Sequence, residues 1–406
     1  MNDVAINEEN LWRLETPGTQ GWGRTARVDD PNKYFMVSTD CHANEPPDLW
    51  VKRIDKKYLD RVPRIEVDEN GVQWRYCEGY RPDRVRVMSF EGEDWIRSKA
   101  GADPADRMKD NQADGIDVEI IFPNKGLAMW ATPDPIFSSA QCAVWNDWAH
   151  EQFTGYGQAM VPVAAIATGD LDCAMAEIER VAKMGYTILS LPCKPVWGAH
   201  DVDHVNYNLP HFDPMWALIQ EADLTMTFHV STGRDPRAAR GNGGAVINYV
   251  THSLAPTIEP VANLCASGVL ERFPNLRFAT VEAGIGWVPW LMDAMDEAYR
   301  KHHMWVRPKL QMLPSEYFRR NGFATFQEDP SGLTLAEDWR LMDNFCWAND
   351  YPHHEGTWPH SYQAIERTMG MLNDVQRAKI LGLNAAKCFK LEVPEHQRLE
   401  AVQAGA

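Results

Sequence analysis

Short apolar runs recur along most of the chain, and they constrain its fold more than any other feature. Eight such runs lie between residues 34 and 350, and each is six or seven residues long. Runs of this length that are apolar on both faces are typical of strands buried in a parallel sheet. The eight runs are Tyr34–Asp40, Asp117–Pro123, Val161–Ala167, Tyr186–Pro192, Leu224–Val230, Arg277–Ala283, Gly322–Gln327 and Asn344–Asp350.

Segments with helical periodicity separate these runs. The segment Leu171–Met184 predicts a helix with an apolar stripe formed by Ala174, Ile178 and Val181. The segment Asp213–Ala222 begins with Asp and Pro, which predicts a helix with Asp213 as its N-cap. Alternation of strands and helices indicates a parallel sheet with right-handed crossovers. Eight strands favour a closed (β/α)₈ TIM-like barrel over an open sheet.

One segment interrupts this alternation after the first strand. Residues 51–114 are polar and charged, and the Asn70-Gly71 pair within them predicts the turn of a β-hairpin. We interpret this segment as an insertion that caps the mouth of the barrel. The predicted organisation is an N-terminal arm (1–33), a barrel that carries the insertion (34–392) and a C-terminal tail (393–406).

Charge and cysteine usage indicate the class of protein. The chain has 40 Lys and Arg against 57 Asp and Glu, a net charge of −17, which argues against binding to nucleic acid or an anionic membrane. Its eight cysteines are dispersed, which is typical of a reduced intracellular protein. The acidic N-terminal sequence contains no secretory apolar region, and no run reaches the roughly 18 apolar residues of a membrane helix. We therefore expect a cytoplasmic protein with neither a nucleic-acid nor a membrane partner.

Polar residues at the ends of three runs form a candidate metal site. The active site of such a barrel lies at the C-terminal ends of its strands. Asp40 and His42 end the first run and point the same way because one residue separates them. His229 ends the fifth run and Asp350 the eighth. An unpaired charge buried there would cost several kcal/mol, so these four residues together predict a bound divalent cation.

Six longer segments, in order along the chain, make the sequence similar to a known family. The chain resembles the amidohydrolase family 2 branch of the amidohydrolase superfamily, which includes aminocarboxymuconate-semialdehyde and gamma-resorcylate decarboxylases. The similarity covers about residues 34 to 391 and is greatest to longer members with an Asp-x-His-x-x-Glu-Pro signature. The segments are DCHANEPPDLW (40–50), ADGIDVEIIFP (113–123), FDPMWALIQEADLTMTFHVSTG (212–233), SGVLERFPNLRFATVEAGIGWVPW (267–290), WANDYPHHEGTWP (347–359) and ILGLNAAKCFKL (380–391).

The resemblance implies a centre with one divalent ion, Zn²⁺ or Mn²⁺. The family's metal ligands on strands one, five and eight correspond in this chain to Asp40, His42, His229 and Asp350, with Asp40 in place of the usual histidine or glutamate of the first strand. Many members carry a histidine after strand six, where this chain has Glu282, so the second acid/base group is either Glu282 or His353. A carboxylate-rich ligand set shifts the preference towards Mn²⁺. Dimers and tetramers prevail in the family, so a homo-oligomer is expected.

Non-oxidative decarboxylation of an aromatic or unsaturated carboxylic acid is the activity that the resemblance favours. Asp350 is predicted to deliver the proton that replaces the carboxyl group, and Glu282 would help it to retain that proton by raising its pKa. Arg234, which follows His229 by five residues, is a candidate clamp for the substrate carboxylate. The expected partner is therefore a small carboxylate, as in aromatic compound catabolism.

Two other functions stay open at this point. A metal-dependent hydrolase of an amide, a lactone or a carbon–carbon bond would use the same ligands, with the ion lowering the pKa of a bound water. A non-catalytic barrel that binds a ligand would be expected to have lost at least one of the four metal-binding residues, and all four are present.

Overall fold

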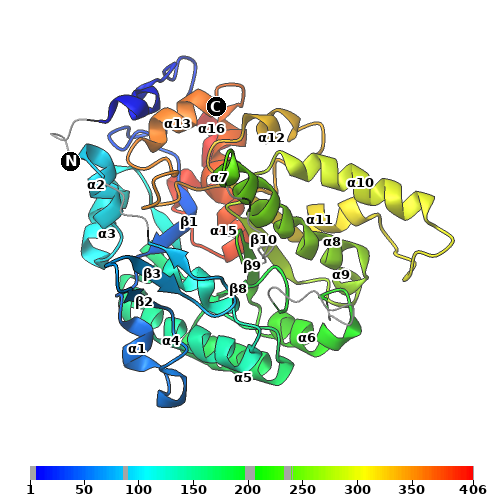
Figure 1. The fold of residues 1–406 in the computed structure, drawn as a ribbon. Coiled ribbons are helices and arrows are strands. Elements are labelled where there is room, and N and C mark those ends of the chain that lie inside the picture. The colour runs from blue at the N-terminus through cyan, green and yellow to red at the C-terminus, as the bar shows by residue number, and fades with distance from the viewer. Residues whose placement is uncertain (1–5, 86–89, 197–205, 233–238, 240, 406) are drawn as a thin grey trace.

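Eight parallel strands form the centre of the molecule, and helices surround them (Figure 1). The computed structural model describes residues 6–85, 90–196, 206–232, 239 and 241–405. Each of the eight predicted runs overlaps a barrel strand, and the third strand is interrupted at Val163 so that β6 and β7 share it. The barrel strands are β1 (Val37–Ala43), β5 (Val118–Pro123), β6 (Met160–Pro162), β7 (Ala164–Ala165), β8 (Ile188–Leu191), β9 (Thr225–His229), β10 (Arg277–Val281), β11 (Gly322–Phe326) and β12 (Phe345–Trp347).

Two hydrogen-bonded sheets make up the barrel, with strand orders β1-β5-β6 and β12-β11-β10-β9-β8-β7. They join at Val163, whose N–H donates to the carbonyl of Ile121 at 3.0 Å. On the opposite side, the N–H of His42 donates to the carbonyl of Tyr351 at 2.6 Å, just beyond β12. The sheets together therefore form the (β/α)₈ barrel that the sequence predicts.

Apolar side chains explain where the strands and their covering helices form. Every residue of β5 is buried, as expected for a strand that is packed on both faces. The helix α5 (Leu171–Met184) has the predicted bounds and buries Ala174, Ile178 and Val181. It ends at Gly185, whose φ of 95° lies in the left-handed region that glycine adopts without steric cost.

The helix predicted over Asp213–Ala222 is α6 (Asp213–Glu221), but its start differs from the prediction. Phe212 is the N-cap, and Asp213 is the first helical residue. The carboxylate of Asp213 lies 2.9 Å from the guanidinium of Arg272 instead. The predicted N-cap role of Asp213 is therefore wrong, because the chain enters α6 directly from a short 3₁₀ turn and the carboxylate pairs with a distant side chain.

The remaining helices cover the barrel or extend the loops between its strands. They are α1 (Leu49–Arg53), α2 (Gly92–Lys99), α3 (Pro104–Ala113), α4 (Pro135–Phe153), α7 (Gly244–Ile247), α8 (Ile258–Ala266), α9 (Val269–Arg272), α10 (Trp287–Lys301), α11 (Pro314–Asn321), α12 (Pro330–Leu335), α13 (Ser361–Thr368), α14 (Asp374–Ala378), α15 (Asn384–Phe389) and α16 (Leu399–Gly405).

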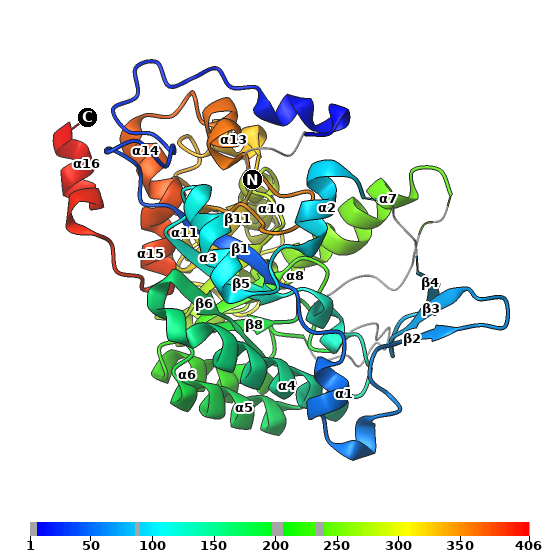
Figure 2. The same cartoon turned by 90° about the vertical axis from the view of Figure 1, so that its left-hand side faces the viewer.

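The segment between β1 and β5 contains a small antiparallel sheet of β2 (Arg64–Val67), β3 (Gln73–Tyr76) and β4 (Asp83–Arg84). The predicted hairpin connects β2 to β3, and the carboxylate of Asp68 accepts from the N–H of Asn70 at 2.9 Å in its turn. Figure 2 shows this sheet and α7 projecting on the same side of the barrel, with α16 on the opposite side. Its capping role and the predicted domain boundaries stay predictions.

The two terminal segments pack against the barrel. In the N-terminal arm, Arg27 Nε lies 2.8 Å from Glu366 Oε1 on α13, and Arg13 Nη2 donates to the carbonyl of His354 at 2.9 Å. Near the C-terminus, Val402 on α16 is only 2% exposed. Both segments therefore contribute buried contacts to the described structure.

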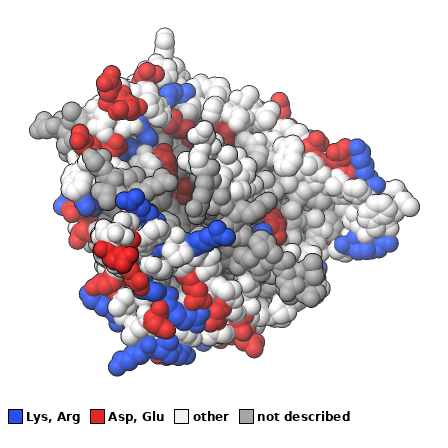
Figure 3. Space-filling model, in the orientation of Figure 1, with Lys and Arg blue, Asp and Glu red and all other residues white. Residues whose placement is uncertain are grey.

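The surface carries charges of both signs. On the face shown in Figure 3, Lys and Arg side chains are interspersed with Asp and Glu side chains. Among the described residues, no helix combines the length and the apolar character that crossing a bilayer requires. The cytoplasmic location and the lack of a nucleic-acid partner stay predictions.

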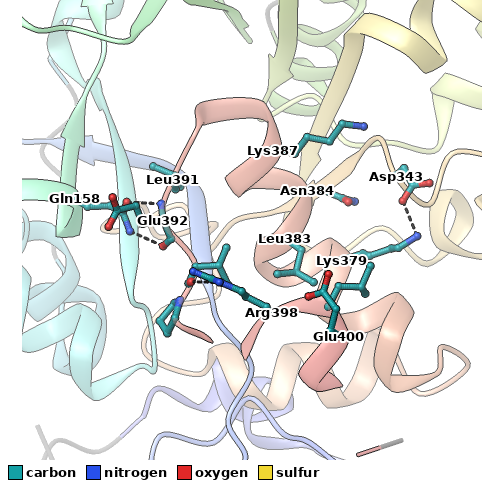
Figure 4. A pocket seen from close by; sticks show the side chains of 13 residues that line it. Gln158, Asp343, Lys379, Leu383, Asn384, Lys387, Leu391, Glu392, Arg398 and Glu400 are labelled. Carbon is teal, nitrogen blue, oxygen red and sulfur yellow. Dashed lines mark hydrogen bonds and ion pairs between the residues drawn. The ribbon is translucent and has the colours of Figure 1, made fainter. Parts of the chain in front are cut away.

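A groove of about 900 Å³ lies at the N-terminal ends of the strands, where Gln158 and Asp343 precede β6 and β12 (Figure 4). Several of its polar groups are already paired. Lys379 Nζ lies 2.7 Å from Asp343 Oδ1, and the side chain of Gln158 hydrogen-bonds the backbone of Glu392. The predicted site residues come from the other ends of the strands, so this groove is separate from them.

Candidate metal centre

Polar side chains meet at the C-terminal end of the barrel. Asp40 and His42 lie on β1, His229 is the last residue of β9, Glu282 directly follows β10, and Asp350 lies three residues beyond β12. All except Glu282 are 0% exposed. The structure thus brings together residues that are far apart in the sequence, as the strand ends predict.

The two histidines point the same ring nitrogen into the cluster. His42 Nδ1 lies 2.9 Å from the carbonyl of Pro123, and His229 Nδ1 lies 2.8 Å from the carbonyl of Val230. A carbonyl only accepts hydrogen bonds, so each Nδ1 carries a proton, and in the neutral imidazole each Nε2 presents a lone pair. The two Nε2 atoms lie 3.3 Å apart. This arrangement suits two imidazole ligands of one cation.

Two carboxylates approach these nitrogens. Asp40 Oδ1 lies 3.3 Å from Nε2 of His42 and 3.4 Å from Nε2 of His229. Glu282 Oε2 lies 3.7 Å and 3.4 Å from the same two atoms. One ligand atom from each of these four residues lies within 4.8 Å of all the others.

Asp350 lies at one side of this group, beside His353. Its Oδ1 lies 3.5 Å from His42 Nε2 and 3.0 Å from His353 Nδ1, while its Oδ2 accepts from Gln327 Nε2 at 2.8 Å. The ring of His353 stacks on that of His42 with 3.9 Å between centroids. Asp350 and His353 form a second group together with His42 and Glu282. His42 and Glu282 therefore belong to both groups.

The backbone is strained where two of these carboxylates leave the barrel. Glu282 has a φ of 59° and Asp350 a φ of 53°, both in the left-handed region. Residues other than glycine adopt this region at a cost of about 1–3 kcal/mol, and such residues concentrate at functional sites. The strain places both carboxylates at the mouth of the barrel.

The residues present fit a divalent cation. Both carboxylate oxygens of Asp40 and Oδ1 of Asp350 are buried without a hydrogen-bond donor. Leaving such oxygens uncompensated is costly, and a cation bound between them would remove that cost. Carboxylate and imidazole donors are the set that Zn²⁺ and Mn²⁺ use in proteins.

Burial and neighbouring charges move the pKa values of the cluster in different directions. Burial acts to raise the pKa of Asp40, but the neighbouring imidazoles of His229 and His42 outweigh it and lower that pKa. Burial, reinforced by the charges of Glu282 and Asp40, raises the pKa of Asp350 well above its ordinary value. The cluster therefore attracts positive charge, which a divalent cation would supply in place of protons.

His353 differs electrostatically from the other two histidines. Burial, followed by the charge of His42, lowers its pKa to about 4. Its ring is therefore neutral near pH 7. A neutral imidazole beside Asp350 can exchange a proton with that carboxylate.

Most of the predicted site residues belong to the cluster, and the predicted substrate clamp cannot be placed. Asp40, His42, His229 and Asp350 converge with the two candidate acid/base residues, Glu282 and His353. Arg234 lies outside the described residues. The roles of all these residues stay predictions.

Gln327 is a site residue that was not predicted. Its amide holds one oxygen of Asp350, and its side chain lines the neighbouring cavity. It is the polar residue at the end of the seventh apolar run, so a search of all eight strand ends would have found it. Tyr249, in the short helical segment Asn248–Leu254, also lines the cavity, and no sequence pattern marks it.

A cavity of about 380 Å³ adjoins the cluster at Glu282. Tyr249, Trp287 and Phe326 supply aromatic walls. Asp329 also lines it, but its carboxylate is occupied because the N–H groups of two consecutive residues after β10 donate to it at 2.7 Å each. The cavity offers space for a small organic ligand beside the cluster.

Comparison with known proteins gives the family. The family model described as Amidohydrolase matches residues 39–391, which include every residue of the cluster. A gamma-resorcylate decarboxylase from Rhodococcus jostii is 26% identical over 197 residues, which are 46% of this chain and 56% of that protein. The aligned region thus spans little more than half the length of this curated relative.

Solved structures share the fold. An amidohydrolase from Mycobacterium avium subsp. paratuberculosis has a TM-score of 0.72 at 18% identity, covering 89% of this chain and 99% of that one. The 5-carboxyvanillate decarboxylase of Sphingomonas paucimobilis has a TM-score of 0.61 at 20% identity, covering 89% and 100%. A dihydroxybenzoic acid decarboxylase from a Polaromonas species, solved with manganese and 2-nitroresorcinol, has a TM-score of 0.62 at 17% identity, covering 89% and 99%. With the family model matched over most of its length, the chain belongs to the amidohydrolase family.

Proposed function

We propose that this protein is a metal-dependent non-oxidative decarboxylase of an aromatic or unsaturated carboxylic acid. Asp40, His42, His229 and Asp350 would hold one ion, Zn²⁺ or Mn²⁺. The first three belong to one candidate group, and Asp350 belongs to a second group that shares His42 with it. The observation that carries the proposal is the convergence of these donors around buried carboxylate oxygens that accept no hydrogen bond. The partial similarity to a gamma-resorcylate decarboxylase supports the choice of reaction.

The chemistry needs negative charge to be stabilised and a proton to be delivered. A bound divalent ion supplies the positive charge that stabilises the electron pair left on the substrate when CO₂ departs. The bond between the carboxyl group and its carbon breaks, and Asp350 then donates a proton to that carbon. His353, whose Nδ1 lies 3.0 Å from Asp350 Oδ1, would return a proton to Asp350. Its side chain is 20% exposed, so it can exchange protons with solvent.

The adjoining cavity suits an aromatic substrate. Trp287 and Phe326 provide apolar surface, and Tyr249 adds a ring near the mouth. Flat apolar walls with a few polar groups are typical of sites that bind ring compounds. Arg234 remains our candidate for the residue that binds the substrate carboxylate. We also expect a homo-oligomer, a dimer or a tetramer, in the cytoplasm.

The proposal is tested by supplying the metal-loaded protein with o-hydroxybenzoates and, separately, with esters, lactones and amides. We expect release of CO₂ from a hydroxybenzoate and, because decarboxylation is reversible, carboxylation of the phenol in concentrated bicarbonate. Hydrolysis is the alternative, since Asp350 beside His353 could equally take a proton from a water molecule. Incorporation of ¹⁸O from labelled water into the product, without release of CO₂, would favour the hydrolase.

A further inference from the structure

Glu282 occupies a position in the cluster that its predicted role as an acid/base group does not require. Its Oε2 faces the Nε2 atoms of His42 and His229, at 3.7 Å and 3.4 Å, and its side chain is only 7% exposed. In the neutral imidazoles these nitrogens present lone pairs, because each histidine carries a proton on Nδ1. A carboxylate and two lone pairs repel one another unless a proton or a metal cation lies between them.

The backbone fixes Glu282 in this orientation. Its N–H donates to Thr325 Oγ1 at 3.2 Å, on the neighbouring strand β11, and its carbonyl accepts from the hydroxyl of Tyr249 at 3.4 Å. Its φ of 59° is held between these two contacts. These contacts hold Glu282 in a strained conformation, and its carboxylate points to the same centre as that of Asp40.

We propose that Glu282 is a direct ligand of the metal ion and that it makes this centre selective for Mn²⁺ over Zn²⁺. The inference depends on the proposed metal centre. Glu282 belongs to the group with Asp40, His42 and His229, and equally to the group with Asp350. It would therefore add a fifth protein donor and a third carboxylate to the four donors already proposed.

The donor set decides which ion is preferred. Zn²⁺ favours four ligands in a tetrahedron and binds imidazole and thiolate well. Mn²⁺ accepts six ligands and prefers carboxylate oxygen. Five protein donors, three of them carboxylates, exceed what a tetrahedral ion uses. Glu282 should therefore contribute more to the binding of Mn²⁺ than to that of Zn²⁺.

The test measures metal affinity, not turnover. The apo-protein is titrated with Mn²⁺ while electron paramagnetic resonance reports the free ion, and with Zn²⁺ against a coloured chelator. For Glu282→Gln we expect the Kd for Mn²⁺ to rise by about 100-fold or more. For Glu282→His we expect a similar loss of Mn²⁺ but a Kd for Zn²⁺ within about 3-fold of wild type, since imidazole is a good zinc ligand.

Glu328→Gln is the matched control. Glu328 lines the same cavity, but its Oε1 lies 2.7 Å from Arg367 Nη2 and it has no place in the cluster. Its substitution removes one nearby negative charge and should leave both Kd values within about 3-fold of wild type.

The melting temperature of the same variants serves as the control for folding. Removing one of three facing carboxylates relieves repulsion, so the apo form of Glu282→Gln should melt at or above the temperature of the wild-type apo form. Glu282→Asp keeps the charge and withdraws the oxygen by one methylene, so it should also lose Mn²⁺ affinity. An unchanged Kd for Mn²⁺ in the folded Gln and Asp variants would overturn the inference and leave the proposed function standing. A wild-type protein that binds neither ion would instead overturn the metal centre itself.

Discussion

The carboxylate of Asp350 is held by different neighbours at its two oxygens. Gln327 donates to Oδ2 at 2.8 Å, whereas Oδ1 lies 3.0 Å from His353 Nδ1 and 3.5 Å from His42 Nε2. Gln327 thus fixes the orientation of the carboxylate, and Oδ1 remains available to the centre. Substitutions at Asp350 and Gln327 therefore separate the chemical step from the positioning of the group that performs it.

Asp350→Asn should abolish turnover and leave the fold intact. The amide has nearly the same shape, but it cannot deliver the proton, and general acids contribute about 10²–10⁴-fold to rates. Steady-state kinetics on the metal-loaded variant, with circular dichroism as the control for folding, tests this expectation. A wild-type rate in Asp350→Asn would remove the proposed role of Asp350.

Gln327→Ala should lower kcat by about 10- to 100-fold, the usual effect of removing a group that orients a ligand or catalytic carboxylate. Because the variant keeps all of the proposed metal ligands, it should still bind the metal ion. Ser331→Ala is the control, since Ser331 lines the same cavity but its hydroxyl contacts Asp329. Equal kcat values for Gln327→Ala and the control would show that Asp350 is oriented without Gln327.

At the scale of secondary-structure elements, a buried hydrogen-bond network joins the end of α3, the start of α13 and the end of β12. Asp114 accepts from the N–H of Ser361 at 3.1 Å and from Asn349 Nδ2 at 3.2 Å. Asn349 in turn accepts from Ser38 Oγ on β1 at 2.7 Å. In the sequence, Ser38 and Asn349 lie just before Asp40 and Asp350. The network therefore connects the first strand to the end of the last one.

Asp114 should make stability depend on pH. Burial raises its pKa from 3.8 to about 6, against the hydrogen bonds from Ser361 and Asn349. The folded state therefore binds a proton that the unfolded state has released, and its free energy of unfolding falls as pH rises between those values. The loss is on the order of 3 kcal/mol and is complete above about pH 7.

Asp114→Asn should remove that part of the pH dependence. Urea denaturation of wild type and variant at about pH 4 and pH 7 gives the four free energies needed, and titration of all other groups cancels in the comparison. Curves for the two proteins that run parallel across this range would contradict the assignment.

The elements themselves were largely predictable, and their exceptions have physical causes. The runs around β1, β9 and β12 are apolar on both faces, and that pattern predicts buried parallel strands. The N-cap role of Asp213 was wrong because a distant ion pair with Arg272 replaced a local hydrogen bond. β4 was not predicted because it is only two residues long and pairs with an exposed hairpin.

At the scale of the whole molecule, the convergence of the site follows from the barrel. Once eight parallel strands close, their C-terminal ends meet, so Asp40, His229 and Asp350 could be brought together from sequence alone. The sequence could not predict the distances that distinguish a metal-ligand role of Glu282 from an acid/base role. They depend on the backbone angle at that residue, which tertiary contacts with Thr325 and Tyr249 maintain.

If the proposed ion is bound, its removal should destabilise the entire protein, because the proposed site exists only in the folded barrel. A ligand at 1,000 times its Kd stabilises the folded state by about 4 kcal/mol. Thermal melting with Mn²⁺, with Zn²⁺ and with a chelator measures the effect. A melting temperature that is the same in all three conditions would count against a bound ion in the cluster.

The seam where β12 meets β1 has a consequence for synthesis of the chain. Ser38 and Asn349 join there across 311 residues, and the residues that follow Asp40 and Asp350, Cys41 and Tyr351, form a parallel bridge at the same junction. A nascent polypeptide that ends before residue 345 lacks both β12 and Asp350. An ion held by this cluster would therefore be captured only at the end of translation, once the C-terminal segment has left the ribosome.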